Sequence, residues 1–516
     1  MSGSKFLSKA FLYLLVGILS FLTAGCAVTG TDSADQGKKV SLLFSFKSSD
    51  LDPHNGFTPL RAGVTETLLR LDEDLQIQEW LATDWKAKDE KTWVFTIRDD
   101  VTFHDGAKVD AAAVKASFER GIADSEALAG ALKIASMEAS GQTLTIQTTE
   151  PHPSLPSELV NPYASVVHVK AEEEMGKKAF NRAPVGTGPF KVTQFTPNTR
   201  VKLERFDDYW AGKPKLKEAT ITFNEDPNVR ALALQSGEAD IAYNLPAESI
   251  DAIEKDDSLK VESVAGLRSH FILYNQQKSL MQDRKVRTAF NHLLNRESVA
   301  KDIMQGHAVP ANGPFHDRLP IGSEEPVVKL DTDQAKALLK KAGYKEGADG
   351  KLMKDGKPLT LEVITYEARP ELPLMAQLLQ SDAAKAGVTI RIKTVEDVDS
   401  YLKENNDWDL ATYSNLTAPR GDGGYFLNTA LTPEGALNQG KIDNPELNDI
   451  VKELNGTSDS DKRIQLTRKA VTVVNREVLH SYGVHPDIIV GMNKRIVGWT
   501  PGGEEYYVLT HTMDVK

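Results

Sequence analysis

Residues 416 to 424 read LTAPRGDGG, and they place one arginine, Arg420, among residues that favour turns. Proline, glycine and aspartate occur in loops because of their backbone geometry, so a solvated surface turn is the simplest interpretation. The triplet Arg-Gly-Asp would also fit an adhesion motif. A guanidinium group can instead hold a carboxylate through two parallel hydrogen bonds, which is the chemistry of a binding site. The elements around the loop decide between these interpretations.

No catalytic motif accompanies this loop. The chain has no Gly-x-Ser-x-Gly elbow, no His-Glu-x-x-His, no Gly-x-x-x-x-Gly-Lys-Ser/Thr phosphate loop and no Cys-x-x-Cys pair. Its 11 histidines are scattered, and His480 and His485 lie five residues apart, which does not place two ligands on one helix face. The sequence therefore predicts neither an enzyme nor a resident cofactor.

Strands and helices alternate in the second half of the chain. Asp331 can cap a helix over 331–344, and strands over 359–366 and 388–395 flank a helix over 373–387. A helix over 400–406 and the strand Asp409–Tyr413 follow. In the first half, we expect strands over 40–46 and 93–98 and helices over 62–71 and 111–122. This alternation predicts an α/β fold with a largely parallel sheet.

The predicted sheet gives Arg420 a position. In open α/β sheets, ligands bind beyond the carboxyl ends of the strands. The loop that carries Arg420 begins two residues after the strand Asp409–Tyr413. We therefore expect Arg420 to face a cleft rather than bulk solvent.

The N-terminus carries a secretory signal. Lys5 and Lys9 precede the apolar run FLYLLVGILSFLTAG, which ends just before Cys26, the only cysteine among 516 residues. This arrangement predicts a lipoprotein signal peptide over 1–25 and lipid attachment at Cys26, followed by a polar tether over 26–39. Removal of two lysines and no acidic residue changes the formal charge from −12 to −14, which argues against nucleic-acid binding.

Four stretches carry a family resemblance: ETLLRLDEDLQIQEWLATDW (66–85), TWVFTIRDDVTFHDG (92–106), APVGTGPFKV (183–192) and DRKVRTAFNHLLNRESV (283–299). In order and spacing they resemble the solute-binding proteins of peptide and nickel ABC importers, from about residue 40 to the C-terminus. The resemblance implies a two-lobed periplasmic-binding-protein fold of type II, with an extra subdomain in the first lobe. It places lobe I at 40–268, lobe II at 269–485 and a return to lobe I at 486–516.

The resemblance is strongest to the nickel and opine-metallophore branch of this family. LTPEGALNQG (431–440) has no histidine, although nickel receptors that bind a metal with a small chelator have one in this stretch. Arg61 and Arg420 stand where the enteric receptors have uncharged residues. They favour a nickel, or similar divalent metal, complex whose chelator exposes carboxylates, with no metal ligand from the protein.

The expected ligand-binding residues are Arg420, Arg61, Asn438, Thr417, Asn161 and Tyr163. The implied partners are the metal complex, an ABC permease and the membrane, through the lipid, and we expect a monomer on the extracytoplasmic face of the cell membrane. Two other functions stay open: a peptide receptor, which would bind many extended ligands, and an enzyme or signalling sensor on the same fold.

Overall fold

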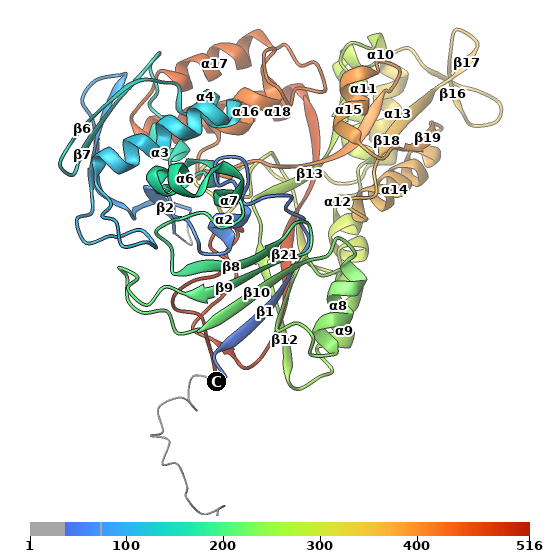
Figure 1. Ribbon diagram of the computed structural model, residues 1–516. Coiled ribbons are helices and arrows are strands. Elements are labelled where there is room, and N and C mark those ends of the chain that lie inside the picture. The colour runs from blue at the N-terminus through green and yellow to red at the C-terminus, as the bar shows by residue number, and fades with distance from the viewer. Residues whose placement is uncertain (1–36, 73–74) are drawn as a thin grey trace, which may run out of the picture.

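The computed structural model describes residues 37–72 and 75–516 of the chain. The predicted signal peptide and the predicted lipid attachment at Cys26 lie outside these residues. Figure 1 shows two groups of strands and helices, with a further small sheet packed beside them. No helix in the described part of the chain is long and apolar enough to span a bilayer.

The first group of strands forms a mixed sheet. Its strands are β1 (Lys39–Phe44), β8 (Phe190–Thr196), β9 (Arg200–Arg205), β10 (Glu218–Phe223), β11 (Ile241–Tyr243) and β12 (Leu259–Ala265). β1 pairs in parallel with β10 and β11, whereas β8, β9 and β10 pair antiparallel. Helices α8 (Pro227–Gln235) and α9 (Ile250–Ile253) cover one face through an apolar cluster that includes Leu234 and Ile489.

The second group contains the predicted alternation. Its strands are β13 (Arg268–Tyr274), β14 (Ala308–Pro310), β18 (Thr360–Thr365), β19 (Thr389–Thr394) and β20 (Leu410–Leu416), and its helices include α11 (Arg284–Leu293), α13 (Thr332–Lys341), α14 (Glu371–Lys385), α15 (Val398–Glu404), α17 (Pro445–Asn455) and α18 (Ser460–Glu477). β18 pairs in parallel with β19 and β20, as predicted, but β13 pairs antiparallel with β20. The sheet is therefore mixed rather than largely parallel.

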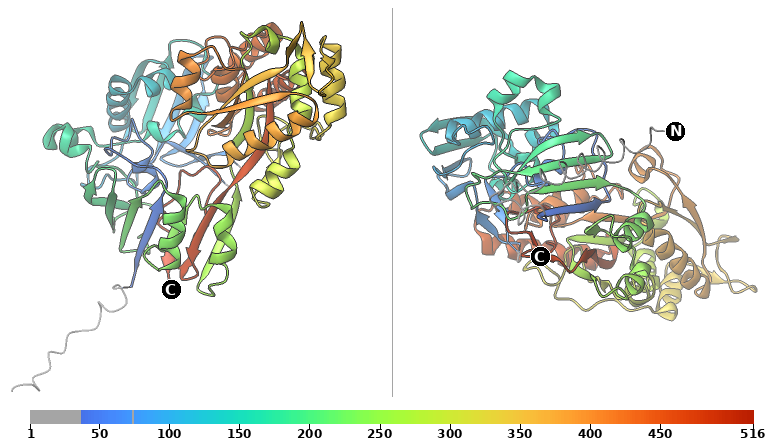
Figure 2. Two further views of the ribbon diagram at one scale, coloured as in Figure 1. Left: turned by 90° about the vertical axis from the view of Figure 1, so that its right-hand side faces the viewer. Right: turned by 60° about the horizontal axis from the view of Figure 1, so that its bottom comes forward.

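One long strand joins the two groups. The first residues of β21 (His480–Asn493) pair with β13 and β14, and from Asp487 onward the strand pairs with β12 and then β11. Figure 2 shows this strand from two further sides as it passes along both groups. Because of β21, twelve described strands form one hydrogen-bonded sheet.

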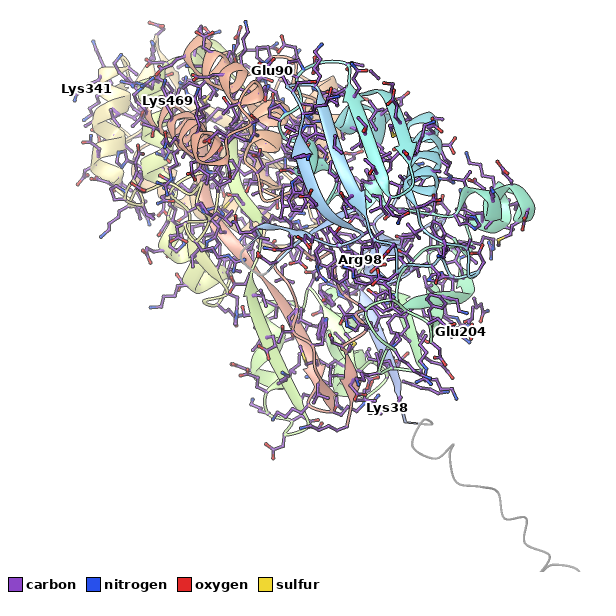
Figure 3. The ribbon with its side chains drawn as sticks, turned by 90° about the vertical axis from the view of Figure 1, so that its left-hand side faces the viewer. Lys38, Glu90, Arg98, Glu204, Lys341 and Lys469 are labelled. Atoms are coloured by element: carbon purple, nitrogen blue, oxygen red, sulfur yellow. The ribbon has the colours of Figure 1, made fainter. Side chains whose placement is uncertain are left out.

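The small sheet is antiparallel and lies between β1 and β8 in the sequence. It has the strand order β4 (Ala82–Ala87), β5 (Thr92–Ile97), β7 (Thr143–Thr148), β6 (Ile134–Ser140). The neighbouring helices are α3 (Ala111–Asp124), α4 (Glu126–Leu132), α5 (Leu155–Glu158) and α6 (Val169–Met175). Figure 3 shows this sheet with Glu90 and Arg98 near its two ends, and exposed lysines such as Lys341 and Lys469 on the far side of the molecule.

Most of the predicted helices are confirmed, and one is wrong. Asp331 caps α13, because its carboxylate accepts a hydrogen bond of 2.8 Å from the backbone N–H of Gln334. The predicted helix 62–71 is instead the end of the short helix α2 (Thr58–Arg61), a turn and the strand β2 (Leu69–Leu71). Gly63 causes this difference, since its φ is +63° and a Cβ there would lie 2.6 Å from the carbonyl oxygen of Leu509.

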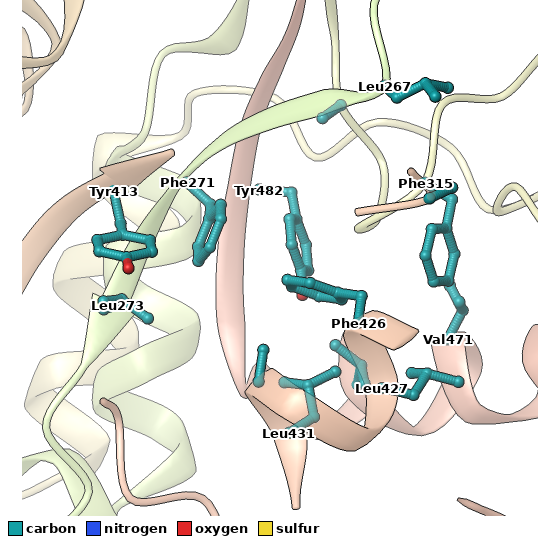
Figure 4. Close-up of a cluster of buried hydrophobic side chains, with 14 of the residues drawn as sticks. Leu267, Phe271, Leu273, Phe315, Tyr413, Phe426, Leu427, Leu431, Val471 and Tyr482 are labelled. Carbon is teal, nitrogen blue, oxygen red and sulfur yellow. The ribbon is translucent and has the colours of Figure 1, made fainter. Parts of the chain in front are cut away.

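An aromatic core supports the loop that carries Arg420. Helix α16 (Gly424–Leu431) begins just after this loop and buries Phe426 completely. The ring centroid of Phe426 lies 6.2 Å from the ring centroids of both Phe271 and Phe315. Figure 4 shows the three side chains within this cluster. Burial of such a side chain contributes roughly 1.5 to 3 kcal/mol, which fixes the start of α16 and the end of the loop before it.

Candidate functional site

The Arg-Gly-Asp loop, residues 417–423, is held on both sides. At its start, the backbone N–H and the hydroxyl of Thr417 both donate to the carbonyl of Leu267, at 2.9 and 3.2 Å. At its end, both carboxylate oxygens of Asp422 accept hydrogen bonds of 2.8 to 3.0 Å from Arg463 on α18. The aspartate therefore anchors the loop internally, and the adhesion interpretation loses one of its three residues.

Arg420 lies at the contact between this loop and helix α5. Its Nη1 donates to a carboxylate oxygen of Glu158, and its guanidinium carbon lies 4.6 Å from the centre of the Tyr425 ring. The Arg420 and Glu158 side chains are only 14% and 12% exposed. Burial lowers the pKa of Arg420 from its ordinary value, although an arginine remains charged in water near neutral pH.

Arg61 ends helix α2 and faces an aromatic wall. Its guanidinium carbon lies 5.1 to 5.3 Å from the ring centres of Phe44, Phe46 and Phe57. Its Nε donates to the carbonyl of Glu505 at 3.0 Å. Among residues 37–72 and 75–516, the two Nη atoms of Arg61 have no hydrogen-bond partner. The two Nη atoms therefore retain hydrogen-bond donors that no described residue uses.

Two tyrosines lie between the arginines. The rings of Tyr163 and Tyr506 lie 5.1 and 5.9 Å from the ring of Phe57. Burial raises the pKa of Tyr506, whereas the positive charges of Arg420 and Arg61 both act to lower it. The positive charges of Arg420 and Arg61 therefore both act on Tyr506, although the two arginines come from distant parts of the chain.

A third arginine lies close by. Arg268 begins β13, and its Nη1 lies 3.3 Å from the Ser414 hydroxyl. Burial and the nearby charge of Arg369 lower the pKa of Arg268 to about 9, and Glu505 opposes this shift. The site therefore contains three arginines, together with Glu158 and Glu505, and its guanidinium groups suit an anionic group.

Comparisons with known proteins identify the family of this chain. Residues 76–438 match the model of the bacterial extracellular solute-binding proteins, family 5. The chain belongs to this family. Of curated proteins, the nickel-binding protein NikA of Staphylococcus aureus is 33% identical over 512 residues, 99% of this chain and 100% of the relative.

Solved structures of family 5 solute-binding proteins agree with this assignment. A nickel ABC transporter structure from Bacillus halodurans has 42% identity and a TM-score of 0.81, and covers 93% of this chain and 100% of its own. A structure of NikA from Staphylococcus aureus in complex with Ni(L-His)2 has 34% identity and a TM-score of 0.79, with the same coverage of both chains. The chain therefore has the two-lobed fold of these binding proteins.

Five of the six expected ligand-binding residues of this family 5 protein lie in this region. The charges of Arg61 and Arg420 both act on Tyr506, the charge of Arg61 also acts on Tyr163, and Thr417 fixes the loop through the bonds to Leu267. Asn161 lies in the same region, beside Tyr163, but its side-chain oxygen caps the short helix η1 (Pro162–Ala164) by accepting the Tyr163 N–H at 3.2 Å. The Asn161 side chain therefore stabilises the start of η1.

Asn438 lies elsewhere. Its amide bonds the carbonyls of Thr432 and Ile442 and the N–H of Ile442, each at 2.8 Å. The carbonyl of the nearby Gly440 accepts a hydrogen bond from the backbone N–H of Gln276, just after the C-terminal end of β13. Arg268 lies at the other end of this strand, which spans about 20 Å. Asn438 therefore braces its own loop, far from the arginines.

The sequence did not indicate three residues of this site. Glu158 and Glu505 bond the arginines from segments hundreds of residues apart, and such contacts leave no local pattern. Tyr506 follows Glu505 directly in the sequence. The run GGEEYY at 502–507 was the one available signal, since paired glycines before aromatic residues suggest a close backbone approach. Gly503 does approach closely, because a Cβ there would lie 2.5 Å from the Ala265 carbonyl.

Two further observations concern the described structure outside the arginine site. In the described part of the chain, no group of three or more His, Cys, Asp or Glu side chains could hold a metal ion. A cavity of about 700 Å³ lies on the first sheet, where its lining includes His104, Lys191, Arg205 and Asp207. It shares no lining residue with the arginine site.

Proposed function

We propose that this family 5 protein is the receptor of an ABC importer that captures a nickel, or similar divalent metal, complex through the carboxylates of its chelator. The observation that carries the proposal is that Arg61, beside the rings of Phe44, Phe46 and Phe57, has two Nη atoms without a hydrogen-bond partner among the described residues. The charges of Arg61 and Arg420 also both act on Tyr506, which indicates that the two guanidinium groups lie in the same region. The names of the Staphylococcus aureus and Bacillus halodurans relatives support nickel.

The charge of the site favours a complexed metal over a free ion. Guanidinium groups repel a bare divalent cation and bind carboxylates strongly, with hydrogen bonds to charged groups contributing about 1.5 to 3 kcal/mol each. An opine-type chelator would supply nitrogen and oxygen ligands to the metal and leave carboxylate oxygens for Arg61 and Arg420. The phenol of Tyr163 would hydrogen-bond from the wall. The chelator, rather than the protein, would then set metal selectivity.

We infer that the lobes are residues 40–268 with 486–516, and residues 269–485. The β12–β13 connection at 266–267 and the change of partners within β21 support two crossings, which would act as a hinge for closure around the ligand. We also propose that Cys26 carries a lipid that holds the receptor, as a monomer, on the extracytoplasmic face of the membrane beside its permease.

Calorimetric titration of the fragment from residue 27 tests the proposal. We expect tight binding of Ni²⁺ preloaded on an opine-type chelator and no binding of free Ni²⁺. Ni(L-His)2 belongs in the same series, because the Staphylococcus aureus structure contains it. Binding of the free ion alone would show that the protein supplies the metal ligands. Binding of peptides alone would move the function to a peptide receptor.

A further inference from the structure

Glu158 and Arg420 form an ion pair between separate parts of the molecule. Glu158 ends helix α5, beside the small antiparallel sheet, and Arg420 follows β20 in the second group of strands. The two residues lie 262 positions apart in the sequence. Their side chains are 12% and 14% exposed, so little water screens the pair. This pair therefore links the two sides of the site.

Glu158 depends on Arg420 for its charge partner. Arg420 is the one side chain among the described residues that bonds the Glu158 carboxylate. Arg420, by contrast, also contacts the ring of Tyr425 and has a Nη2 and a Nε that bond no described side chain. Leaving a partly buried carboxylate such as Glu158 without its one partner costs free energy, whereas Arg420 keeps its contact with the Tyr425 ring and has two further nitrogen donors.

The loop that carries Arg420 is held by contacts of the two residues after the arginine. Gly421 has a φ of +69°, and a Cβ there would lie 2.4 Å from the carbonyl of Leu75, on the side of Glu158. Asp422 is fixed by Arg463. Rotation of the Arg420 side chain is therefore enough for a change of partner while the contacts of Gly421 and Asp422 are kept.

We propose that Glu158 is an internal carboxylate that competes with the carboxylate of the ligand for Arg420. This inference rests on the proposed function. A ligand must offer Arg420 a better anionic partner than Glu158, so the receptor selects complexes with exposed carboxylates and a net negative charge. Glu158 thereby sets the specificity of the site without binding the ligand.

The direction in which Glu158→Gln changes the affinity for a nickel complex tests the proposal. In the full lipid-free chain from residue 27, Glu158→Gln should bind Ni²⁺ on a tricarboxylate opine-type chelator three- to tenfold more tightly than wild type, and neutral Ni(L-His)2 with a smaller gain. The affinity of Glu158→Asp, which keeps the charge on a shorter side chain, should fall between those of wild type and Glu158→Gln. In an Arg420→Ala background, Glu158→Gln should give no gain. Glu174→Gln, an exposed change on α6, is the matched control.

The outcomes separate the two proposals. Unchanged or weaker binding by Glu158→Gln, with wild-type binding intact, would overturn the competition and show that Glu158 only positions Arg420. Failure of wild type to bind any nickel complex would overturn the proposed function, and the competition with it. Thermal unfolding of each variant shows whether it is folded, and Glu158→Asp supplies the comparison if Glu158→Gln is not.

Discussion

Glu66 is a buried carboxylate that four uncharged side chains hold. Its Oε1 accepts from the Trp80 indole at 2.8 Å and the Tyr209 hydroxyl at 2.6 Å. Its Oε2 accepts from the Thr187 hydroxyl at 2.7 Å and the Trp210 indole at 3.1 Å. Burial raises the pKa of Glu66, and the four hydrogen bonds oppose this shift. The group joins segments from residue 66 to residue 210.

Replacement of this carboxylate should destabilise the protein. In Glu66→Gln, one acceptor oxygen becomes an NH2 group that faces two donors, so we expect the free energy of unfolding to fall by about 2 to 4 kcal/mol. Urea unfolding followed by circular dichroism measures the change. Glu79→Gln, at an exposed position nearby, should leave the unfolding midpoint unchanged. A midpoint for Glu66→Gln equal to that of wild type would show that the hydrogen bonds contribute nothing net.

Arg61 offers a test of guanidinium geometry against charge. Arg61→Lys retains a positive charge but loses the planar fork and its stacking on Phe44, Phe46 and Phe57. We expect binding of the nickel complex to weaken roughly tenfold, a change of about 1.4 kcal/mol. Calorimetry measures this loss, and Arg391→Lys, at an exposed position on β19, is the control. Equal affinity in Arg61→Lys would mean that no bidentate contact forms there.

Arg61 and Arg420 stand out in the sequence because their type alone restricts their chemistry, and their role in ligand binding stays a prediction. A guanidinium group in a loop beyond the end of a strand has few chemical roles, whichever residues it contacts. Glu158 could not be predicted, since carboxylates number 73 in this chain and only the packing of distant segments selects one of them. The amide of Asn438 bonds the backbone of its own loop, because an amide suits a ligand and a loop backbone equally well, and its predicted role in ligand binding stays a prediction.

At the scale of elements, the Arg-Gly-Asp loop depends on a glycine. Gly421→Ala would force a side chain into the left-handed region and against the Leu75 carbonyl. We expect a loss of about 1 to 3 kcal/mol in stability and a weaker affinity for the nickel complex. Thermal unfolding and calorimetry measure the two effects. Gly130→Ala is the control, because a Cβ at Gly130 meets no atom within 4 Å, and in helix α4 it should be neutral or stabilising.

Local signals predicted the elements that local forces form. The helices near 331–344 and 373–387 have periodic apolar residues and terminal glycines, and Asp331 caps the first of them. They are present as α13 and α14. The segment 62–71 has helical periodicity too, but the backbone of Leu509 selects its turn at Gly63. Likewise, no local pattern reveals that β21 changes partners halfway along its length.

At the scale of the whole molecule, buried histidines are spread through both groups of strands and the small sheet. Burial lowers the pKa of His104 and His152 to about 4, and the pKa of His480 and His485 to about 3. In the unfolded chain the pKa of a histidine is about 6.5. Between these values, the unfolded chain binds protons that the folded protein excludes.

Acid should therefore destabilise the protein well above the pH at which its carboxylates titrate. A histidine with a depressed pKa contributes stability that is present above pH 6.5 and lost as the pH falls, by about 1.4 kcal/mol per pH unit for each group. Glu66 acts in the opposite direction, because a carboxyl group with a raised pKa favours the folded state at low pH. With four such histidines, we expect the free energy of unfolding to fall between pH 6.5 and pH 4.

Urea unfolding at a series of pH values from 7.5 to 4 measures this loss, and His152→Asn tests its cause. His152 is 6% exposed, and its Nε2 lies 2.8 Å from the Ala131 carbonyl. The variant loses this contact and is less stable at neutral pH, but it no longer titrates at this position. Its stability should therefore fall less steeply with acid than that of wild type, by about 1.4 kcal/mol per pH unit. Parallel curves for the two proteins would mean that His152 binds protons equally in the folded and unfolded states, despite its burial.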